Sequence, residues 1–152
     1  METLKLLHAR QAVRQYTGQL TDEQLQTILA AGNAAPVGMG NYADYRLIAI
    51  QDPQILQQMS QIYAAPTVIV VAARQPDTMT LLSAGIIAHN LELAAEDLGL
   101  GANYNLAGLA SIPHKVLPAG FTAVFSLTLG QTTQPFTPRQ IPADRIKTKL
   151  IK

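Results

Sequence analysis

The chain of 152 residues suits one domain and leaves little for a second. Charged residues make up only 14% of it, against about 25% in typical soluble proteins, so part of its apolar surface is expected to lie against a second copy. A net charge of +1, an aromatic fraction of 5% and the lack of Trp argue against a nucleic-acid binder. The lack of Cys excludes disulfides, thiolate zinc sites and thiol nucleophiles.

No targeting or membrane segment is expected. Charged side chains are spread through residues 2–10, which therefore hold no signal-peptide core. The most apolar long run, Met79–Leu100, contains Glu92, Glu96 and Asp97, which argues against a membrane span. We therefore expect a cytoplasmic protein that binds neither membrane nor nucleic acid.

Two helices are predicted at the start of the chain. The first runs from about residue 2 to residue 7 or 9, with Leu4 and Leu7 on one face. The second is opened by Thr21, whose capping-box partner is Gln24. Apolar residues at i, i+3 and i+4 spacing follow, and Gly32 ends the helix.

The middle of the chain predicts two strands and two helices. A strand over Tyr45–Gln51 is followed by Asp52-Pro53, which predicts a helix start and a helix to about Ile62. The β-branched run Pro66–Ala73 is typical of a strand covered on both faces. A long, deeply buried helix is expected over residues 77–99.

The last part predicts a short helix, a strand and an extended arm. The helix follows Ser111-Ile112-Pro113 to about residue 117, and the strand covers Ala123–Gln131. Prolines from residue 132 onward predict the arm, with a final strand or turn near Arg145–Ile151. This order indicates an α+β fold with helices on both faces of a small sheet. Such a sheet is a poor independent core, which favours a homodimer with the long helix or the arm at its interface.

Most catalytic motifs are missing from the sequence. It has no H-E-x-x-H, no G-x-S-x-G and no phosphate-binding loop ending in Gly-Lys-Ser/Thr. His8, His89 and His114 have no partner at metal-ligand spacing, so no metal site is expected, and Glu96-Asp97 is interpreted as a solvated acidic turn. A redox reaction would therefore need a bound cofactor, such as a flavin, that supplies its own hydride chemistry.

The segment Arg10–Tyr16 holds two arginines four residues apart at a helix end. Taken alone, it is either a surface basic turn or a compact anion site with guanidinium fork geometry. It resembles the N-terminal signature of the nitroreductase family, commonly Arg-Arg-Ser-Val-Arg-x-Phe/Tyr, in which Arg10, Val13, Arg14 and Tyr16 match. The resemblance implies that Arg10 reaches the FMN phosphate.

The same resemblance implies roles for the neighbours of Arg10. Arg14 would lie along the N1/C2=O edge of the flavin, where its charge stabilises the reduced anionic ring. Ala12 replaces the usual Ser, so only a backbone contact remains there, and Gln11 replaces the second basic residue.

The segment Ala35–Asn41 resembles the family's Ala-Pro-Ser-Ser-x-Asn loop. Pro36 and Asn41 match, with one extra residue before Asn41, while Val37 and Gly38 stand at the two Ser positions. Glycine-rich backbone approaches a ring closely and offers N–H donors. In the family, this loop reaches the flavin of the partner subunit. As a loop alone, it is equally consistent with a simple helix-to-strand connection.

The segment Ser83–Gly101 resembles the family's long central helix more closely than any other part of the chain resembles its family counterpart. Its small residues permit close helix packing, and Asn90 is expected to be hydrogen-bonded and structural. The loop that follows corresponds to the family segment whose backbone approaches the flavin N5, with Asn105, Leu106 and Gly108 as the nearest positions.

Family members also place a C-terminal Arg on the FMN phosphate. Arg139, three residues before Pro142, is the expected equivalent, and Arg145 is the alternative. Family members often carry extra helices between the second strand and the long helix, and these are missing here.

Together the segments imply one nitroreductase-like FMN-binding domain over residues 1–152. The implied protein is an intertwined homodimer with a small antiparallel sheet and two FMN sites at its interface. NAD(P)H would reduce the flavin at N5 and leave, and a nitroaromatic, a quinone or a similar acceptor would be reduced by ping-pong hydride transfer without a catalytic side chain. Two alternatives stay open: a flavin-binding homodimer that acts as a flavin store or redox sensor without turnover, and a structural dimer without a cofactor.

Overall fold

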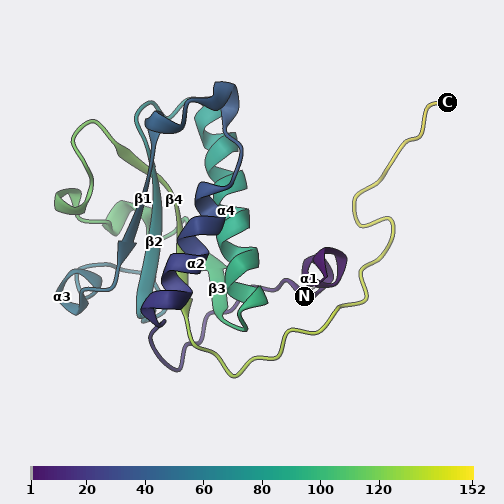
Figure 1. The fold of residues 1–152 in the computed structure, drawn as a ribbon, viewed down its shortest axis with the longest axis horizontal. Coiled ribbons are helices and arrows are strands. Elements are labelled where there is room, and N and C mark those ends of the chain that lie inside the picture. The colour runs from purple at the N-terminus through teal and green to yellow at the C-terminus, as the bar shows by residue number, and fades with distance from the viewer. Residues whose placement is uncertain (1) are drawn as a thin grey trace.

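A computed structural model of the protein describes residues 2–152. Its centre is a four-stranded antiparallel sheet of order β1-β2-β4-β3 (Figure 1). The strands are β1 Tyr45–Ile50, β2 Thr67–Ala73, β3 Gly101–Tyr104 and β4 Thr122–Gly130. The α+β fold with a small antiparallel sheet is therefore as the sequence predicts.

Strand β2 is the buried centre of the sheet. Every residue of Thr67–Ala73 is buried, because β1 and β4 pair with its two edges and side chains cover both faces. The continuous β-branched run of the sequence predicts this environment correctly.

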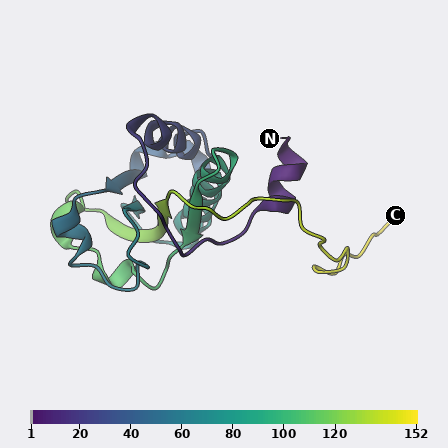
Figure 2. The same cartoon turned by 90° about the horizontal axis from the view of Figure 1, so that it is seen from below.

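Two long helices cover one face of the sheet, α2 Asp22–Asn33 and α4 Thr78–Asp97, and they lie side by side in Figures 1 and 2. The predicted capping box opens α2, where Thr21 and Gln24 exchange hydrogen bonds. Asp77 caps α4, and Gly99, at a φ of +74°, follows its end. Within the described part of the chain, no helix is long and apolar enough to cross a membrane.

The other face is covered by shorter elements: α3 Pro53–Leu56 and the 3-10 turns η3 Leu109–Ser111 and η4 His114–Val116. The prediction of a helix to Ile62 is wrong, because α3 ends at Leu56. The residues that follow form a loop that is bonded to distant segments: Ser60 N–H donates to Ser111 Oγ, and Asn105 Nδ2 donates to the Gln61 carbonyl. The predicted short helix before residue 117 is the second of the two 3-10 turns.

Four elements are present that the sequence did not predict: β3 and the 3-10 turns η1 Gly38–Gly40, η2 Tyr42–Asp44 and η3. Strand β3 begins at a glycine because the N-terminal segment crosses there. A Cβ on Gly101 would lie 2.7 Å from Val13 Cγ1. The glycines that mark the helix end therefore also belong to the start of an edge strand.

Helix α1 Thr3–Ala9 and the C-terminal arm stand away from the rest of the molecule (Figures 1 and 2). Residues 10–18 connect α1 to the body and run along the sheet edge, where Val13 N–H donates to the Ala102 carbonyl and Thr17 N–H to that of Gln131. The arm beyond residue 131 has no helix or strand in the described protein. It does form a turn in which Arg145 N–H donates to the Pro142 carbonyl.

Helix α4 is buried on one side only. The prediction of deep burial holds for Ala84 and Ala88, which are fully buried, but the Leu82 and Ile86 side chains are 65% and 45% exposed. Leu4 on α1 is exposed too. The described protomer therefore leaves part of its apolar helix surface uncovered.

Candidate functional site

The segment of residues 10–18, here called the linker, is fixed to the sheet at two points. Val13 is buried, and the Tyr16 hydroxyl lies 2.7 Å from the Val13 carbonyl and 2.6 Å from Thr128 Oγ1. Burial raises the pKa of Tyr16 to about 12, so its hydroxyl stays protonated. Arg10 and Arg14 lie on either side of the buried Val13 and are therefore held on a fixed backbone.

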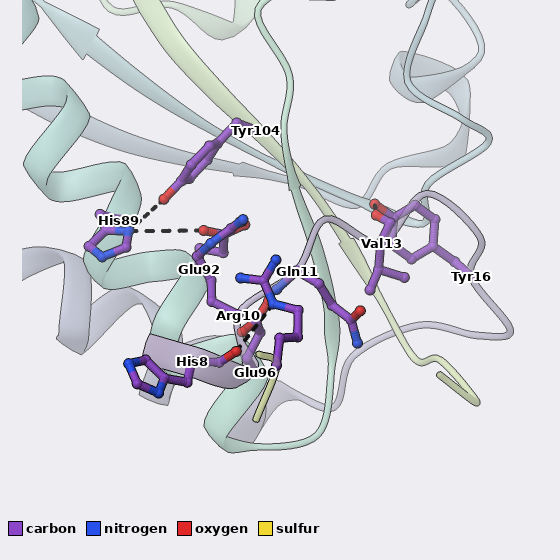
Figure 3. Close-up of polar contacts among 10 residues, drawn as sticks. His8, Arg10, Gln11, Val13, Tyr16, His89, Glu92, Glu96 and Tyr104 are labelled. Atoms are coloured by element: carbon purple, nitrogen blue, oxygen red, sulfur yellow. Dashed lines mark hydrogen bonds and ion pairs between the residues drawn. The ribbon is translucent and has the colours of Figure 1, made fainter. Parts of the chain in front are cut away.

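Arg10 contacts a buried carboxylate on α4. Its Nη1 lies 3.1 Å from Glu92 Oε1, and Glu92 has no exposed side-chain surface (Figure 3). Arg139 of the arm comes to the same place: its backbone N–H and its Nε both donate to the His8 carbonyl at the end of α1. Two cations far apart in the sequence, both predicted as phosphate ligands, are therefore brought to one end of α1.

Glu96 lies one helical turn beyond Glu92 and is also buried, with 1% of its surface exposed. Its Oε1 accepts the Gln11 backbone N–H at 2.9 Å, and burial raises its pKa to about 7. The interpretation of Glu96-Asp97 as a solvated turn is wrong for Glu96, because the linker covers it, whereas Asp97 is exposed. The spacing between Glu92 and Glu96, which places both on one face of α4, was the available sequence signal.

His89 and Tyr104 complete this cluster. His89 Nδ1 lies 2.7 Å from the Tyr104 hydroxyl and 4.0 Å from Glu92 Oε2 (Figure 3). Burial is the first cause that raises the pKa of Tyr104, and the Glu92 carboxylate adds to it. Sequence reasoning missed Tyr104, because β3 was not predicted. Among residues 2–152, no group of three His, Asp or Glu side chains is arranged to hold a metal ion.

Arg14 turns to a different neighbour. Its guanidinium carbon lies 5.9 Å from the centre of the Tyr63 ring, and both side chains are exposed. Tyr63 has a φ of +56° and forms one wall of a cavity of about 510 Å³ with Leu56, Met59 and Ile62. Left-handed backbone at a non-glycine residue often accompanies a functional site. Tyr63 is a second residue that the sequence did not single out.

The loop predicted to approach the flavin N5 is braced by Asn105. This buried side chain donates to the Gln61 carbonyl at 3.0 Å and accepts the Gly108 N–H at 3.0 Å, and Ser126 Oγ donates to the Asn105 carbonyl. Its amide therefore holds the loop, while the Leu106 side chain is 57% exposed. Asn105 also bonds to the Gln61 carbonyl, so its loop lies beside the Gln61–Tyr63 segment. The Tyr63 ring of that segment is the neighbour of Arg14.

The loop with Pro36, Val37, Gly38 and Asn41 lies elsewhere in the protomer. It packs on the first turns of α4, where Gly38 N–H donates to Ser83 Oγ at 3.0 Å. A Cβ on Gly38 would lie 2.3 Å from Met79 Sδ. The Arg10 contact to Glu92 is on the other half of the same helix, so the protomer does not bring this loop together with the linker.

The remaining predicted residues make structural contacts or lie at the surface. Asn90 Nδ2 donates to the Ala31 carbonyl at 3.1 Å and joins α4 to α2, as its structural role requires. Gln11 Nε2 donates to the Pro135 carbonyl of the arm, and Ala12 is partly exposed between Gln11 and Val13. Arg145 makes its turn contact in the exposed arm and is not placed beside Arg10 by any described contact.

Comparisons with known proteins identify similar chains. The model of the nitroreductase family matches residues 59–117. A curated NADPH-flavin oxidoreductase of Vibrio harveyi is 28% identical over an alignment of 171 positions that covers 93% of this chain and 70% of that protein.

Solved structures share the fold over almost the whole chain. A nitroreductase with bound FMN from Desulfitobacterium hafniense superposes with a TM-score of 0.83 at 24% identity and covers 99% of both chains. The NADPH:FMN oxidoreductase of V. harveyi complexed with NAD+ gives a TM-score of 0.74 at 25% identity over 97% of this chain and 76% of that one. The first likeness, at its low identity, establishes the common fold.

Proposed function

We propose that this chain is a member of the nitroreductase family, whose model matches residues 59–117, and that it is an FMN-dependent oxidoreductase that moves a hydride from NAD(P)H to a small planar acceptor. The observation that carries the proposal is the meeting of Arg10 and Arg139 at one end of α1. Solved relatives with bound FMN and a curated NADPH-flavin oxidoreductase support it.

The described residues fit an FMN molecule at this place. Arg10 and Arg139 supply cations for the phosphate, and Arg10 uses only Nη1 in its contact with Glu92, so its remaining donors are free for an anion. Arg14 and Tyr63 offer an exposed cation and ring at the expected pyrimidine edge. The loop braced by Asn105 presents the exposed Leu106, and the missing side chain of Gly108 lets this loop pack closely against Asn105 and Ile62.

Bound FMN would supply the hydride chemistry at its N5, in a ping-pong sequence with NAD(P)H as donor and a quinone or nitroaromatic as acceptor. The protein's residues bind and orient the two substrates. Arg14 would place a positive charge beside the pyrimidine edge of a bound flavin, and would so favour its reduced anionic form electrostatically. No side chain is proposed as a catalytic acid or base.

A second copy of the chain is part of the proposed site. The Pro36–Asn41 loop contacts α4 at Ser83, and Arg10 contacts it at Glu92, nine residues or about 14 Å further along the helix. A partner protomer is therefore proposed to bring its own copy of this loop to the flavin held by the linker. The exposed Leu82 and Ile86 side chains on α4 supply apolar surface for such a contact.

One observation favours the alternative of a flavin store or redox sensor. Val37 and Gly38 offer no hydroxyl groups, and the Gly38 N–H is already bonded to Ser83 Oγ, so this loop has fewer donors for a ring. The same loss of donors would weaken flavin binding and slow turnover without changing the fold.

The visible spectrum of the purified protein tests these functions in order. We expect a yellow protein that bleaches within seconds when NAD(P)H is added without oxygen and that regains its colour with a quinone. A yellow protein that does not bleach would support the store or sensor. A colourless protein that takes up no added FMN would contradict every flavin function.

A further inference from the structure

Two buried carboxylates lie one helical turn apart on α4. Glu92 and Glu96 have 0% and 1% of their surfaces exposed. Glu92 Oε1 faces Arg10 and Glu96 Oε1 accepts the Gln11 N–H, while the Oε2 atoms of both have no hydrogen-bond partner in the described protein. A buried charged oxygen without a partner is costly, so this arrangement calls for an explanation.

The two carboxylates hold the part of the linker that the proposed function assigns to the flavin phosphate. Glu92 fixes the direction of the Arg10 guanidinium, and Glu96 fixes the backbone at the next residue, Gln11. An arginine of long, flexible side chain loses less entropy on binding an anion when a fixed partner already restrains it.

The two arginines near Glu96 already have other partners. The charged and titratable groups around Glu96 are Glu92 of α4, Arg10 of the linker, Tyr104 of β3 and Arg139 of the arm. His89 lies beyond Glu92, with its Nδ1 4.0 Å from Glu92 Oε2. Glu92 already pairs with Arg10, and Arg139 donates its Nε to the His8 carbonyl. Burial and the neighbouring Glu92 raise the pKa of Glu96 to about 7, against the bond from Gln11 and the two arginines, which lower it.

Resting on the proposed FMN function, we propose that Glu92 and Glu96 are positioning residues for the phosphate contact, and that Glu96 weakens FMN binding when it loses its proton. With Glu96 protonated, the two arginines and Glu92 leave one net positive charge facing the phosphate. With Glu96 ionised, that charge is cancelled. A phosphate monoester carries close to two negative charges at neutral pH and is therefore sensitive to this difference.

The sign of the effect separates it from the titration of FMN itself. The second ionisation of a phosphate monoester lies near pH 6, and it strengthens binding to arginines as pH rises. Loss of the Glu96 proton acts in the opposite direction, at about pH 7. A single unit charge acting through partly buried protein changes the affinity roughly 5- to 30-fold.

The first test needs only the full-length wild-type apoprotein. Dissociation constants for FMN and for riboflavin, which has no phosphate, are measured by flavin fluorescence between pH 6 and 8.5. We expect FMN affinity to fall roughly 5- to 30-fold over this range, with a midpoint near pH 7, and riboflavin affinity to stay constant. A constant or rising ratio of FMN to riboflavin affinity would overturn the proposal.

Two variants and a control locate the effect. Glu96→Gln should remove the fall in FMN affinity above pH 7. Glu92→Asp keeps the negative charge but is too short to hold Arg10 in the same position, so it should weaken FMN binding at every pH and leave the midpoint near pH 7. Glu23→Gln, at an exposed position on α2, should behave as wild type. A full pH response in Glu96→Gln would reject the role of Glu96, and unchanged FMN binding in Glu92→Asp would reject the positioning role of Glu92.

The tests distinguish a failure of the proposed FMN function from a failure of the proposed pH dependence. Wild-type protein that binds no FMN at any pH would remove the proposed function and this inference together. FMN binding with a flat profile, or with the same profile for riboflavin, would remove only the inference. The wild-type comparison does not depend on either variant folding.

Discussion

The buried Glu92 gives Arg10 a structural role beside its proposed contact with phosphate. Arg10→Ala would leave Glu92 Oε1 without its partner at 3.1 Å, so we expect the free energy of unfolding of the apoprotein to fall by about 2–3 kcal/mol. Urea unfolding at pH 8 measures this loss. The double variant Arg10→Ala/Glu92→Leu should recover most of it, and an equally unstable double variant would show that the ion pair is not its cause.

Glu96 makes stability depend on pH in a direction opposite to that of most carboxylates. Its pKa is raised from the ordinary 4.5 to about 7, so the folded protein binds the proton more tightly than the unfolded chain. The free energy of unfolding should therefore fall as the pH rises from about 4.5 to 7, and this group should cause no further change above that range. The loss is at most about 3 kcal/mol. Subtracting the pH profile of Glu96→Gln isolates it, and identical profiles would count against the raised pKa.

Arg14 is exposed beside Tyr63, where its charge can act on a flavin without serving as a fold contact. Replacing it by Gln keeps hydrogen-bonding capacity and removes the charge. If Arg14 lies by the flavin N1 edge, the midpoint potential should fall by roughly 20–60 mV, the equivalent of one charged hydrogen bond. Spectroelectrochemistry of the two holoproteins measures it, and equal potentials with FMN fully bound would reduce Arg14 to a positioning role.

At the scale of elements, the contact between α2 and α4 depends on the missing side chain of Gly32. A Cβ there would lie 2.6 Å from Leu91 Cδ2 and 3.2 Å from Leu47 Cδ1, inside the core. Gly32→Ala gains about 1 kcal/mol in helix propensity but should lose about 1–3 kcal/mol by overpacking. We expect a net loss in thermal unfolding, whereas Gln26→Ala on the exposed face of α2 should stay within about 0.5 kcal/mol. A stabilised Gly32→Ala protein would mean that the side chains around Gly32 move aside without loss of packing energy.

Elements with strong local signals were predictable, and those set by distant contacts were not. The Thr21–Gln24 capping box and the run Pro66–Ala73 fix α2 and β2 within the sequence itself. The early end of α3 follows from Asn105, whose side chain draws the Gln61 carbonyl across the sheet. Strand β3 depends on β4 for its pairing, and local composition gave it the features of a loop.

The candidate site shows the same division. The resemblance to the family's motifs identified Arg10, Arg14 and Arg139 as candidate site residues. The fold brings Arg10 and Arg139 to one end of α1. The sequence could not reveal that Glu96 is buried, because Gln11 of the linker, which covers it, lies 85 residues away along the chain. Nor could it reveal Tyr63 beside Arg14, a contact between two exposed side chains on different loops.

At the scale of the whole molecule, the protomer has the features of one half of an assembly. Helix α1 and the arm extend away from the body (Figure 2). The Arg139 Nε donates to the His8 carbonyl and so joins the arm to the end of α1. The exposed side of α4 carries Leu82 and Ile86 in the N-terminal half of the helix. A second copy would cover this apolar surface and would bring its own residues 36–41 toward the linker.

Dimerisation and flavin binding should therefore be lost together when the exposed side of α4 is made charged. Leu82→Arg/Ile86→Arg replaces two side chains that are 65% and 45% exposed in the protomer, so the fold of each chain should survive. In a dimer, burial of each would contribute about 1.5–3 kcal/mol, and two buried arginines would oppose association. Sedimentation should show a wild-type dimer and a monomeric variant of 16.3 kDa with unchanged circular dichroism and no retained FMN. Gln54→Arg, exposed on α3 across the sheet, is the matched control and should stay dimeric. A variant that remains dimeric would place the interface elsewhere, and a monomer that keeps FMN would show that the site needs no partner loop.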